Sequence, residues 1–250
     1  MLALVTATLD SMSTLPSALK SVRGIQSRIK HVFVDGGSTD GTASYIRSHI
    51  KKDPNVVIVE QAGKGLYEAL NQGIQVAIDD LRVTHIGLLH SDDRLIESAF
   101  ERYLSVIETE SSPVFYSGIE FHDNSGRCRR VWESGEYSKF KLNTGWMPPH
   151  TSMIVTKDVY CDVGMYNPQL GTAADYDWVV RVLTAQGENS RYFPERTLSM
   201  LVGGASNVSL KARLRANRMD GRVWADKSTL QALLVRICKP LRKIGQFKVI

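Results

Sequence analysis

The sequence predicts an α/β fold with a mostly parallel, Rossmann-like central sheet flanked by helices and a C-terminal basic helical extension. Three observations predict it. Short β-rich runs alternate with helix-like stretches through the first half, polar clusters follow several of these runs, and residues 207–250 are basic with apolar residues at helical spacing. Such alternation is typical of parallel strands whose crossover helices cover both faces of a sheet.

Four strands are expected in the first half, in the order Leu2–Thr8, His31–Asp35, Val56–Glu60 and Thr84–Leu89. Helices are expected between them, from Ser13–Thr14 with Pro16 to Gly24, from about Thr42, and over Leu66–Ile78. Asp40 or Thr39 can cap the helix that begins near Thr42, because both side chains accept hydrogen bonds from free backbone N–H groups.

The second half changes pattern after Pro113. A strand-like run over Val114–Phe121, a turn at Asp123–Gly126 and an extended run ending near Trp132 predict a hairpin. The stretch Gly145–His150 must be irregular, because its two prolines fit neither a helix interior nor a central strand. A helical pattern resumes over Ala173–Ala185.

Composition indicates an ordinary globular chain, since 43% of the 250 residues are hydrophobic and 23% are charged. No apolar run is long enough to span a membrane, and the start lacks the features of a secretory signal. We therefore expect a cytoplasmic location. The three cysteines show no metal-ligand spacing and indicate no disulfide framework.

The net charge of +5 is unevenly distributed. Residues 207–250 carry 11 Lys/Arg against 2 Asp, whereas residues 1–206 carry a net −4. This asymmetry predicts an anionic partner for the tail, such as phospholipid, although charge alone does not distinguish phospholipid from nucleic acid. For the protein as a whole we expect no nucleic acid as a partner. Two interpretations stay open: the tail packs on the body as solvated amphipathic helices, or Leu230–Phe247 lies on an anionic membrane. The apolar stripes are Leu210 and Leu214, then Leu230, Leu233, Leu234, Ile237 and Leu241.

Polar residues follow the first, second and fourth predicted strands, at Thr6–Asp10, Asp35–Asp40 and His90–Asp93. In an open parallel sheet these segments converge on one crevice beyond the carboxyl ends of the strands. An acidic crevice repels phosphates unless a divalent cation intervenes, and such cations favour carboxylate oxygens. The pattern thus predicts a nucleotide and metal site, although Asp92–Asp93 alone is equally typical of a helix N-cap.

Four segments in order carry a family resemblance: Val34–Thr42, Gly65–Gly73, Ser91–Asp93 and Ala174–Trp178. With them the chain resembles the family 2 glycosyltransferases, the inverting enzymes of GT-A-type fold, including bacterial enzymes of exopolysaccharide and surface-glycan biosynthesis. The resemblance implies a catalytic domain at 1–206, with a nucleotide-sugar half at about 1–112 and an acceptor half at about 113–206. The basic amphipathic tail then occupies 207–250.

The resemblance also implies roles for individual residues. Asp175 matches the catalytic base, with Asp177 as its competitor, and Asp93 matches the position that holds Mn²⁺ or Mg²⁺. One departure is Gly36, where many relatives carry a second aspartate. The nucleotide-sugar contacts expected from the resemblance and from position are Thr6, Thr8, Asp35, Lys64, Asn71, Asp92 and His150.

The expected function is metal-dependent, inverting transfer of a sugar from a UDP- or GDP-sugar to a hydroxyl of a glycan or lipid-linked acceptor. Asp175 would take the proton from that hydroxyl. If the tail binds lipid, the protein would lie peripherally on the cytoplasmic face of the inner membrane. The alternatives are a catalytically inactive nucleotide-sugar-binding relative and a nucleotidyltransferase, although Leu4–Asp10 lacks the glycine-rich basic segment that nucleotidyltransferases usually need.

Overall fold

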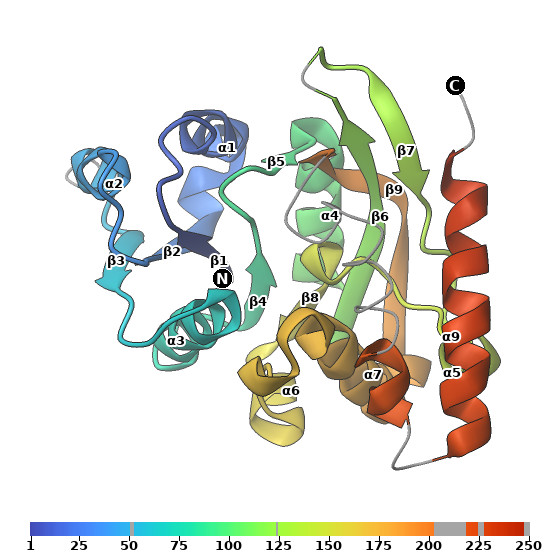
Figure 1. Ribbon diagram of the computed structural model, residues 1–250. Coiled ribbons are helices and arrows are strands. Elements are labelled where there is room, and N and C mark those ends of the chain that lie inside the picture. The colour runs from blue at the N-terminus through green and yellow to red at the C-terminus, as the bar shows by residue number, and fades with distance from the viewer. Residues whose placement is uncertain (51–52, 124, 203–218, 225–227, 248–250) are drawn as a thin grey trace.

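A computed structural model describes residues 1–50, 53–123, 125–202, 219–224 and 228–247 (Figure 1). The first half alternates as predicted. Its strands are β1 (Leu2–Thr8), β2 (Ile29–Asp35), β3 (Val56–Glu60) and β4 (His85–Leu88), and its helices are α1 (Leu15–Ser21), the 3₁₀ helix η1 (Arg23–Arg28), α2 (Thr42–Ile50) and α3 (Leu66–Ile78).

The central sheet has nine strands, in the order β3-β2-β1-β4-β8-β6-β9-β5, with β7 paired to β6. Strands β3, β2, β1 and β4 are mutually parallel, as predicted for the first half. Beyond β4 the sheet is mixed, because β8 (Ile154–Thr156) runs antiparallel to both β4 and β6 (Val114–His122). β6 in turn pairs in parallel with β9 (Ser190–Leu201), which pairs antiparallel with the two-residue β5 (Arg94–Leu95).

Alternate side chains of the first strands enter two separate cores. Val5 and Val32 pack with Leu70 and Ile74 of α3 on one face of the sheet. On the other face, Leu4 packs with α4 (Glu97–Thr109) and η1, while α1 and α2 cover Phe33. Burial on both faces explains why these strands read as continuous apolar runs in the sequence.

Helix α3 lies very close to the sheet. A Cβ on Gly73 would come within 2.4 Å of Val5 Cγ1 and 3.0 Å of Val34 Cγ2, so a larger residue would push the helix away from β1 and β2. The last residue of the segment Gly65–Gly73 is therefore explained by packing.

The second half contains the predicted hairpin, formed by β6 and β7 (Cys128–Trp132). The stretch Gly145–His150 is irregular as expected, and α7 (Ala174–Gln186) matches the predicted helix. Trp178 of α7 is buried in the core. The remaining elements are α5 (Lys139–Asn143), η2 (His150–Ser152), α6 (Lys157–Val163), η3 (Pro168–Ala173), η4 (Gly187–Asn189), α9 (Thr229–Ile244) and η6 (Gly245–Phe247).

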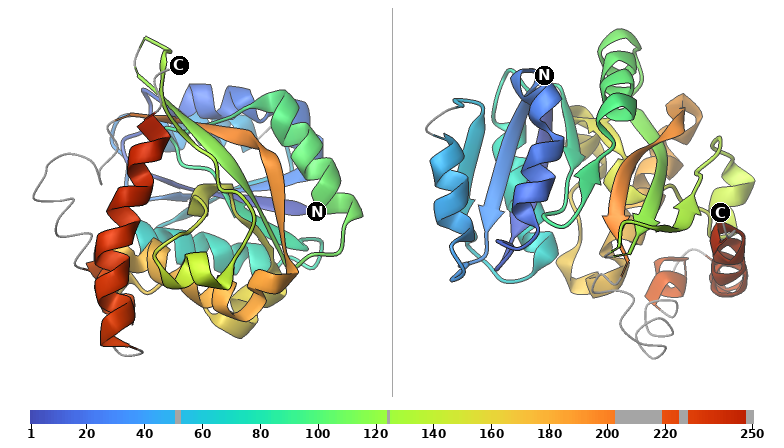
Figure 2. Two further views of the ribbon diagram at one scale, coloured as in Figure 1. Left: turned by 90° about the vertical axis from the view of Figure 1, so that its right-hand side faces the viewer. Right: turned by 90° about the horizontal axis from the view of Figure 1, so that it is seen from above.

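The described part of the tail packs on the body. Ala232 and Val235 of α9 are buried in the same core as α7, and Lys239 pairs with Asp220 at 2.8 Å. Gly145 faces Lys239 and Val235 so closely that a Cβ would lie 2.9 Å from Lys239 Cβ. Helix α9 lies at the end of the molecule opposite β3 and α2 (Figures 1 and 2). The predicted stripe at Leu210 and Leu214 lies outside the described residues.

Candidate active site

The loops after β1, β2 and β4 meet at one edge of the sheet, as predicted. Asp10 Oδ1 accepts a hydrogen bond from the Thr39 backbone N–H at 2.7 Å, which joins the first loop to the second. Ser91 Oγ donates to Ser11 Oγ at 3.0 Å, which joins the fourth strand's loop to the first. Asp40 accepts from the Thr42 backbone at the start of α2, as the capping prediction required.

Asp35 organises the loop between β2 and α2. Its carboxylate accepts from the backbone N–H groups of Gly37 and Ser38 and from the hydroxyls of Ser38 and Thr8, at 2.6 to 3.2 Å. Burial opposes ionisation of Asp35, but these hydrogen bonds outweigh it and hold the pKa of Asp35 below its ordinary value. The carboxylate is therefore ionised and already satisfied inside the protein.

Thr6 and Thr8 are both buried at the end of β1. The Thr6 hydroxyl donates to the Leu89 carbonyl at 2.6 Å and lies 2.9 Å from His31 Nε2. The Thr8 hydroxyl donates to Asp35 Oδ1 at 3.0 Å. These contacts make the predicted nucleotide-facing hydroxyls parts of the protein's own hydrogen-bond network.

Asp92 and Asp93 differ sharply in exposure. Asp92 is exposed, whereas Asp93 is only 1% exposed and its Oδ2 has no hydrogen-bond partner among the described residues. Burial, followed by the neighbouring Asp92 carboxylate, raises the pKa of Asp93 well above its ordinary value. An unpaired buried carboxyl oxygen costs free energy unless a proton or a cation compensates it, so this acidic pair suits a divalent cation.

A histidine pair lies beside Asp175 at the start of α7. The rings of His90 and His150 are 5.8 Å apart, and His150 Nδ1 lies 3.5 Å from Asp175 Oδ2. Burial and the nearby His150 lower the pKa of His90 to about 4, although Asp92 and Asp175 both oppose this shift. Burial also lowers the pKa of His150 against the opposing charge of Asp175. Both imidazoles are therefore neutral at pH 7.

Asp175 and Asp177 point to different surroundings, as their spacing on α7 requires. Asp177 Oδ2 pairs with Arg181 Nε at 2.8 Å, and Arg181 also donates to the carbonyls of Val163 and Met165. Asp175 faces His150 and keeps 26% of its side chain exposed. This arrangement favours Asp175 over Asp177 as the carboxylate available to a substrate.

The side chain of Asn71 is hydrogen-bonded within the protein, whereas Lys64 is exposed. The Asn71 side chain donates to the Tyr166 carbonyl at 2.8 Å and accepts from the Tyr166 backbone N–H at 3.1 Å, so it ties α3 to the segment before η3. This structural role differs from the predicted sugar contact. Lys64 is exposed at the start of α3, where it is open to a ligand.

Two residues near Asp175 were not predicted as site residues. Tyr67 of α3 is largely buried, and both burial and the Asp175 charge raise its pKa. His90 follows the fourth strand directly, in the segment predicted to converge on the crevice. That position was the only feature of the sequence that indicated a place for His90 in the site. No feature of the sequence indicated Tyr67, because its proximity to Asp175 depends on how α3 packs against α7.

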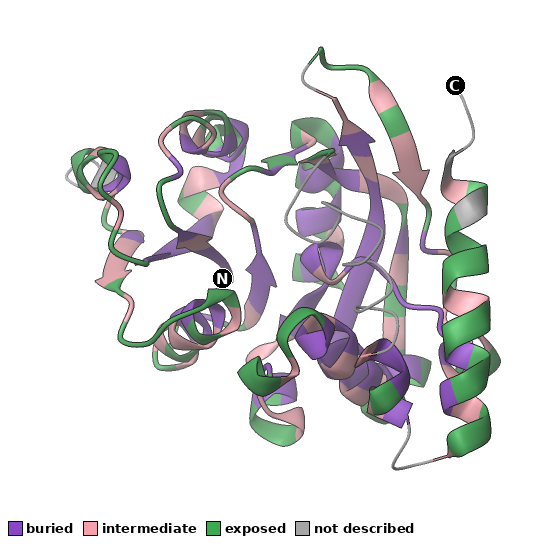
Figure 3. Cartoon of the chain, in the orientation of Figure 1, coloured by how far each residue is buried: buried purple, intermediate pink, exposed green. Residues whose placement is uncertain are grey.

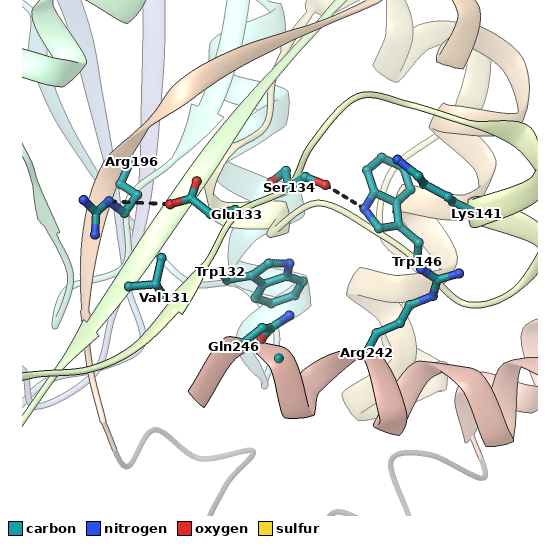
Figure 4. A pocket seen from close by; sticks show the side chains of 10 residues that line it. Val131, Trp132, Glu133, Ser134, Lys141, Trp146, Arg196, Arg242 and Gln246 are labelled. Atoms are coloured by element: carbon teal, nitrogen blue, oxygen red, sulfur yellow. Dashed lines mark hydrogen bonds and ion pairs between the residues drawn. The ribbon is translucent and has the colours of Figure 1, made fainter. Parts of the chain in front are cut away.

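A cavity of about 620 Å³ lies elsewhere, between α9 and the segment after β7 (Figure 4). Trp132, Trp146 and Arg242 line it, and none of the predicted site residues does. Trp146 itself is buried, and its indole N–H donates to the Ser134 carbonyl at 2.9 Å. Trp146 thus fills the core beneath its loop.

Glu120, His122 and Cys128 form another group of possible metal ligands in the described part of the chain, with ligand atoms within 4.8 Å of one another. Glu120 Oε2 already lies 3.3 Å from Arg196 Nη1, so its charge is partly neutralised. This group sits on the β6–β7 hairpin and includes none of the strand-end carboxylates.

Comparison with known proteins agrees with this geometry. The model of glycosyl transferase family 2 matches residues 4–161, more than half of the chain, and the chain therefore belongs to that family. An uncharacterized glycosyltransferase of Mycobacterium tuberculosis is 26% identical over 196 residues, which cover 71% of this chain and 66% of the relative. The uncharacterized glycosyltransferase EpsJ of Bacillus subtilis is 29% identical over 108 residues, 43% of this chain and 30% of its own length.

Solved structures share the fold at low identity. TarS 1–349 of S. aureus has a TM-score of 0.68 with 14% identity, over 98% of this chain and 72% of that chain. Its complex with UDP-GlcNAc gives the same TM-score and identity over 94% of this chain and 70% of that chain. The mannosyltransferase PcManGT of Pyrobaculum calidifontis, solved with GDP-Man and Mn²⁺, has a TM-score of 0.64 with 13% identity, over 96% and 71%. These likenesses confirm the predicted GT-A-type fold.

Proposed function

We propose that the chain is a metal-dependent, inverting glycosyltransferase that moves a sugar from a nucleoside-diphosphate sugar to an acceptor hydroxyl. The observation that carries this proposal is the position of Asp175, a partly exposed carboxylate that faces His150 near the strand-end pair Asp92–Asp93. Membership of glycosyl transferase family 2 supports it. Solved neighbours that contain UDP-GlcNAc or GDP-Man support a UDP- or GDP-sugar as the donor.

The donor's nucleoside would lie over the loops after β1 and β2. In this part of the site Thr6, Thr8 and Asp35 act by holding the loops in place, because their polar atoms are already hydrogen-bonded within the protein. A preorganised loop loses little conformational entropy when a ligand binds. Lys64, exposed at the start of α3, would approach the diphosphate.

Asp92 is the residue we assign to Mn²⁺ or Mg²⁺, with the buried carboxyl group of Asp93 behind it. The resemblance favoured Asp93, but the exposed Asp92 is the carboxylate that a ligand in solvent can reach. The orphaned Oδ2 of Asp93 fits a nearby cation. A bound divalent ion would neutralise the charge that develops on the departing nucleoside diphosphate.

Asp175 would accept the proton of the acceptor hydroxyl as the oxygen attacks the anomeric carbon and the bond to the diphosphate breaks. A single displacement of this kind inverts the anomeric configuration. His150 would position the Asp175 carboxylate through its Nδ1, which lies 3.5 Å from Oδ2. Burial keeps both histidines neutral at pH 7, so neither adds a positive charge beside Asp175.

The acceptor we propose is a glycan or a lipid-linked intermediate used on the cytoplasmic face of the inner membrane, within polysaccharide biosynthesis. The basic tail supports this, because its charge suits an anionic lipid surface. None of the described helices is long and apolar enough to cross a membrane.

The decisive assay measures release of nucleoside diphosphate from a panel of UDP- and GDP-sugars, with Mn²⁺, with Mg²⁺ and with a chelator. We expect one donor to be consumed only with metal, and Asp92→Asn to slow this at least about 100-fold. Asp162→Asn removes an exposed carboxylate from α6 and is the matched control.

Two outcomes would overturn the assignment. A folded protein that binds a nucleotide sugar but leaves every donor intact is an inactive relative. A protein that instead releases pyrophosphate from a nucleoside triphosphate and a sugar phosphate is a nucleotidyltransferase.

A further inference from the structure

Helix α9 exposes an apolar stripe to solvent. Its five large aliphatic side chains are each between 36% and 67% exposed, and their spacing places them on one side of the helix. Figure 3 shows exposed residues over most of the outward surface of α9. The members of this stripe, the α9 stripe, are Leu230, Leu233, Leu234, Ile237 and Leu241.

The opposite side of the same helix is what holds α9 on the body. Ala232 and Val235 are buried, and Lys239 pairs with Asp220 and lies 3.4 Å from the centre of the Tyr176 ring. Near the C-terminal end, Arg242 donates to Thr144 Oγ1 at 2.8 Å. These contacts hold α9 on the described body without any contribution from the α9 stripe.

The charge around the stripe indicates what that partner is. Residues 229–247 contain four cations and no acidic residue. Three of them, Arg236, Arg242 and Lys243, are exposed, whereas Lys239 pairs with Asp220. A second copy of this helix would bring like charges together, whereas an anionic phospholipid surface attracts the cations and accepts the leucines.

We propose that the α9 stripe lies in the headgroup region of an anionic phospholipid membrane, with the helix axis parallel to the surface. The aliphatic side chains would enter the boundary between headgroups and acyl chains, while the exposed cations of α9 lie close to the lipid phosphates. The proposal deepens the proposed function by naming the surface that brings the enzyme to a membrane-bound acceptor. It does not depend on catalysis.

The test is flotation of the full chain with vesicles, without any nucleotide sugar. We expect binding to vesicles that contain phosphatidylglycerol and phosphatidylcholine, little binding to phosphatidylcholine alone, and weaker binding as salt rises from about 0.05 M to about 0.5 M. The triple variant Leu233→Gln, Ile237→Gln, Leu241→Gln should lower binding about tenfold or more. Leu81→Gln, at a leucine that is 91% exposed and distant in sequence, should bind as wild type does.

Thermal unfolding of each variant verifies folding, which these exposed positions should preserve. Equal binding of the folded triple variant and the wild type would overturn the proposal, as would equal binding to neutral and anionic vesicles. A dimer in analytical ultracentrifugation that the triple variant abolishes, without vesicle binding, would assign the stripe to self-association instead. Donor turnover is measured without vesicles, and vesicle binding is measured without a donor. Failure of the proposed function is therefore distinguishable from failure of the proposed membrane contact.

Discussion

The loop after β2 and the start of α7 both carry acidic residues, but they use them in opposite ways. Asp35 accepts four hydrogen bonds from its own loop and from Thr8, so its carboxylate is saturated by the fold. Asp175 has a partly exposed carboxylate that faces a neutral histidine. The loop after β2 is therefore held in one conformation by Asp35. The carboxylates of Asp92 and Asp175, in contrast, remain accessible to a substrate or a metal ion.

Removing the carboxylate of Asp175 should have the largest effect. Asp175→Asn is expected to lower kcat about 10²- to 10⁴-fold, because an amide cannot accept the acceptor's proton. Asp177→Asn, two residues along the same helix, should change kcat only a few-fold. Asp177→Asn should instead lower the free energy of unfolding, because it weakens the ion pair with Arg181. Similar kinetic losses in both variants would contradict the assignment of the base.

Substitutions in the loop after β2 should lower the stability of the protein more than its activity. Asp35→Ala leaves the buried Thr8 hydroxyl and three part-buried donors of Gly37 and Ser38 without their acceptor, so we expect the free energy of unfolding to fall by about 3 kcal/mol. Ser38→Ala removes only one donor side chain and should cost about 1 kcal/mol. Urea unfolding at pH 7 measures both. A large loss of kcat in Asp35→Ala with unchanged stability would mean that Asp35 takes part in the chemistry.

Acid should destabilise the first half of the sheet through His31. Burial lowers the pKa of His31 from 6.5 to about 3, so the unfolded chain binds this proton first as the pH falls. The stabilising contribution is present above about pH 6.5 and is lost as the pH falls toward 3. Between pH 7 and 5 we expect a loss of about 2 kcal/mol, which His31→Gln should remove. An unchanged pH dependence in His31→Gln would contradict this origin.

Lys64 should give the smallest effect. Because Lys64 is exposed, Lys64→Ala is expected to raise the KM for the donor about threefold and to leave kcat and the unfolding midpoint unchanged. Lys139→Ala on α5, at another exposed lysine, is the surface-lysine control. A fall in kcat without a change in KM would show that Lys64 acts in the transition state instead of in binding.

Much of the fold was predictable because the first strands are buried on both faces and therefore appear as apolar runs. β8 was not predicted, because three residues carry no readable periodicity. β9 was not predicted either, since Pro194 and several charged residues interrupt its pattern where its pairing with β6 shifts register. The parallel pairing predicted for the first half holds for β1 to β4, and the order of the strands in the mixed half depends on long-range pairing.

The site was predictable in its positions and less so in its details. Strand ends and family motifs indicated Asp35, Asp92, Asp93 and Asp175 before any coordinates, with Asp93 as the expected metal ligand. The sequence could not show that Asp93 is buried behind Asp92, or that Asn71 is hydrogen-bonded to Tyr166. Both facts depend on the packing of segments that are far apart along the chain.

The most direct test of the account is the position of Mn²⁺ in crystals grown with a nucleoside diphosphate, located by anomalous scattering at the manganese edge. The account predicts a peak beside the Asp92 carboxylate, on the same side of the sheet edge as Asp175. A peak at Glu120, His122 and Cys128, or one held by Asp35, would contradict it.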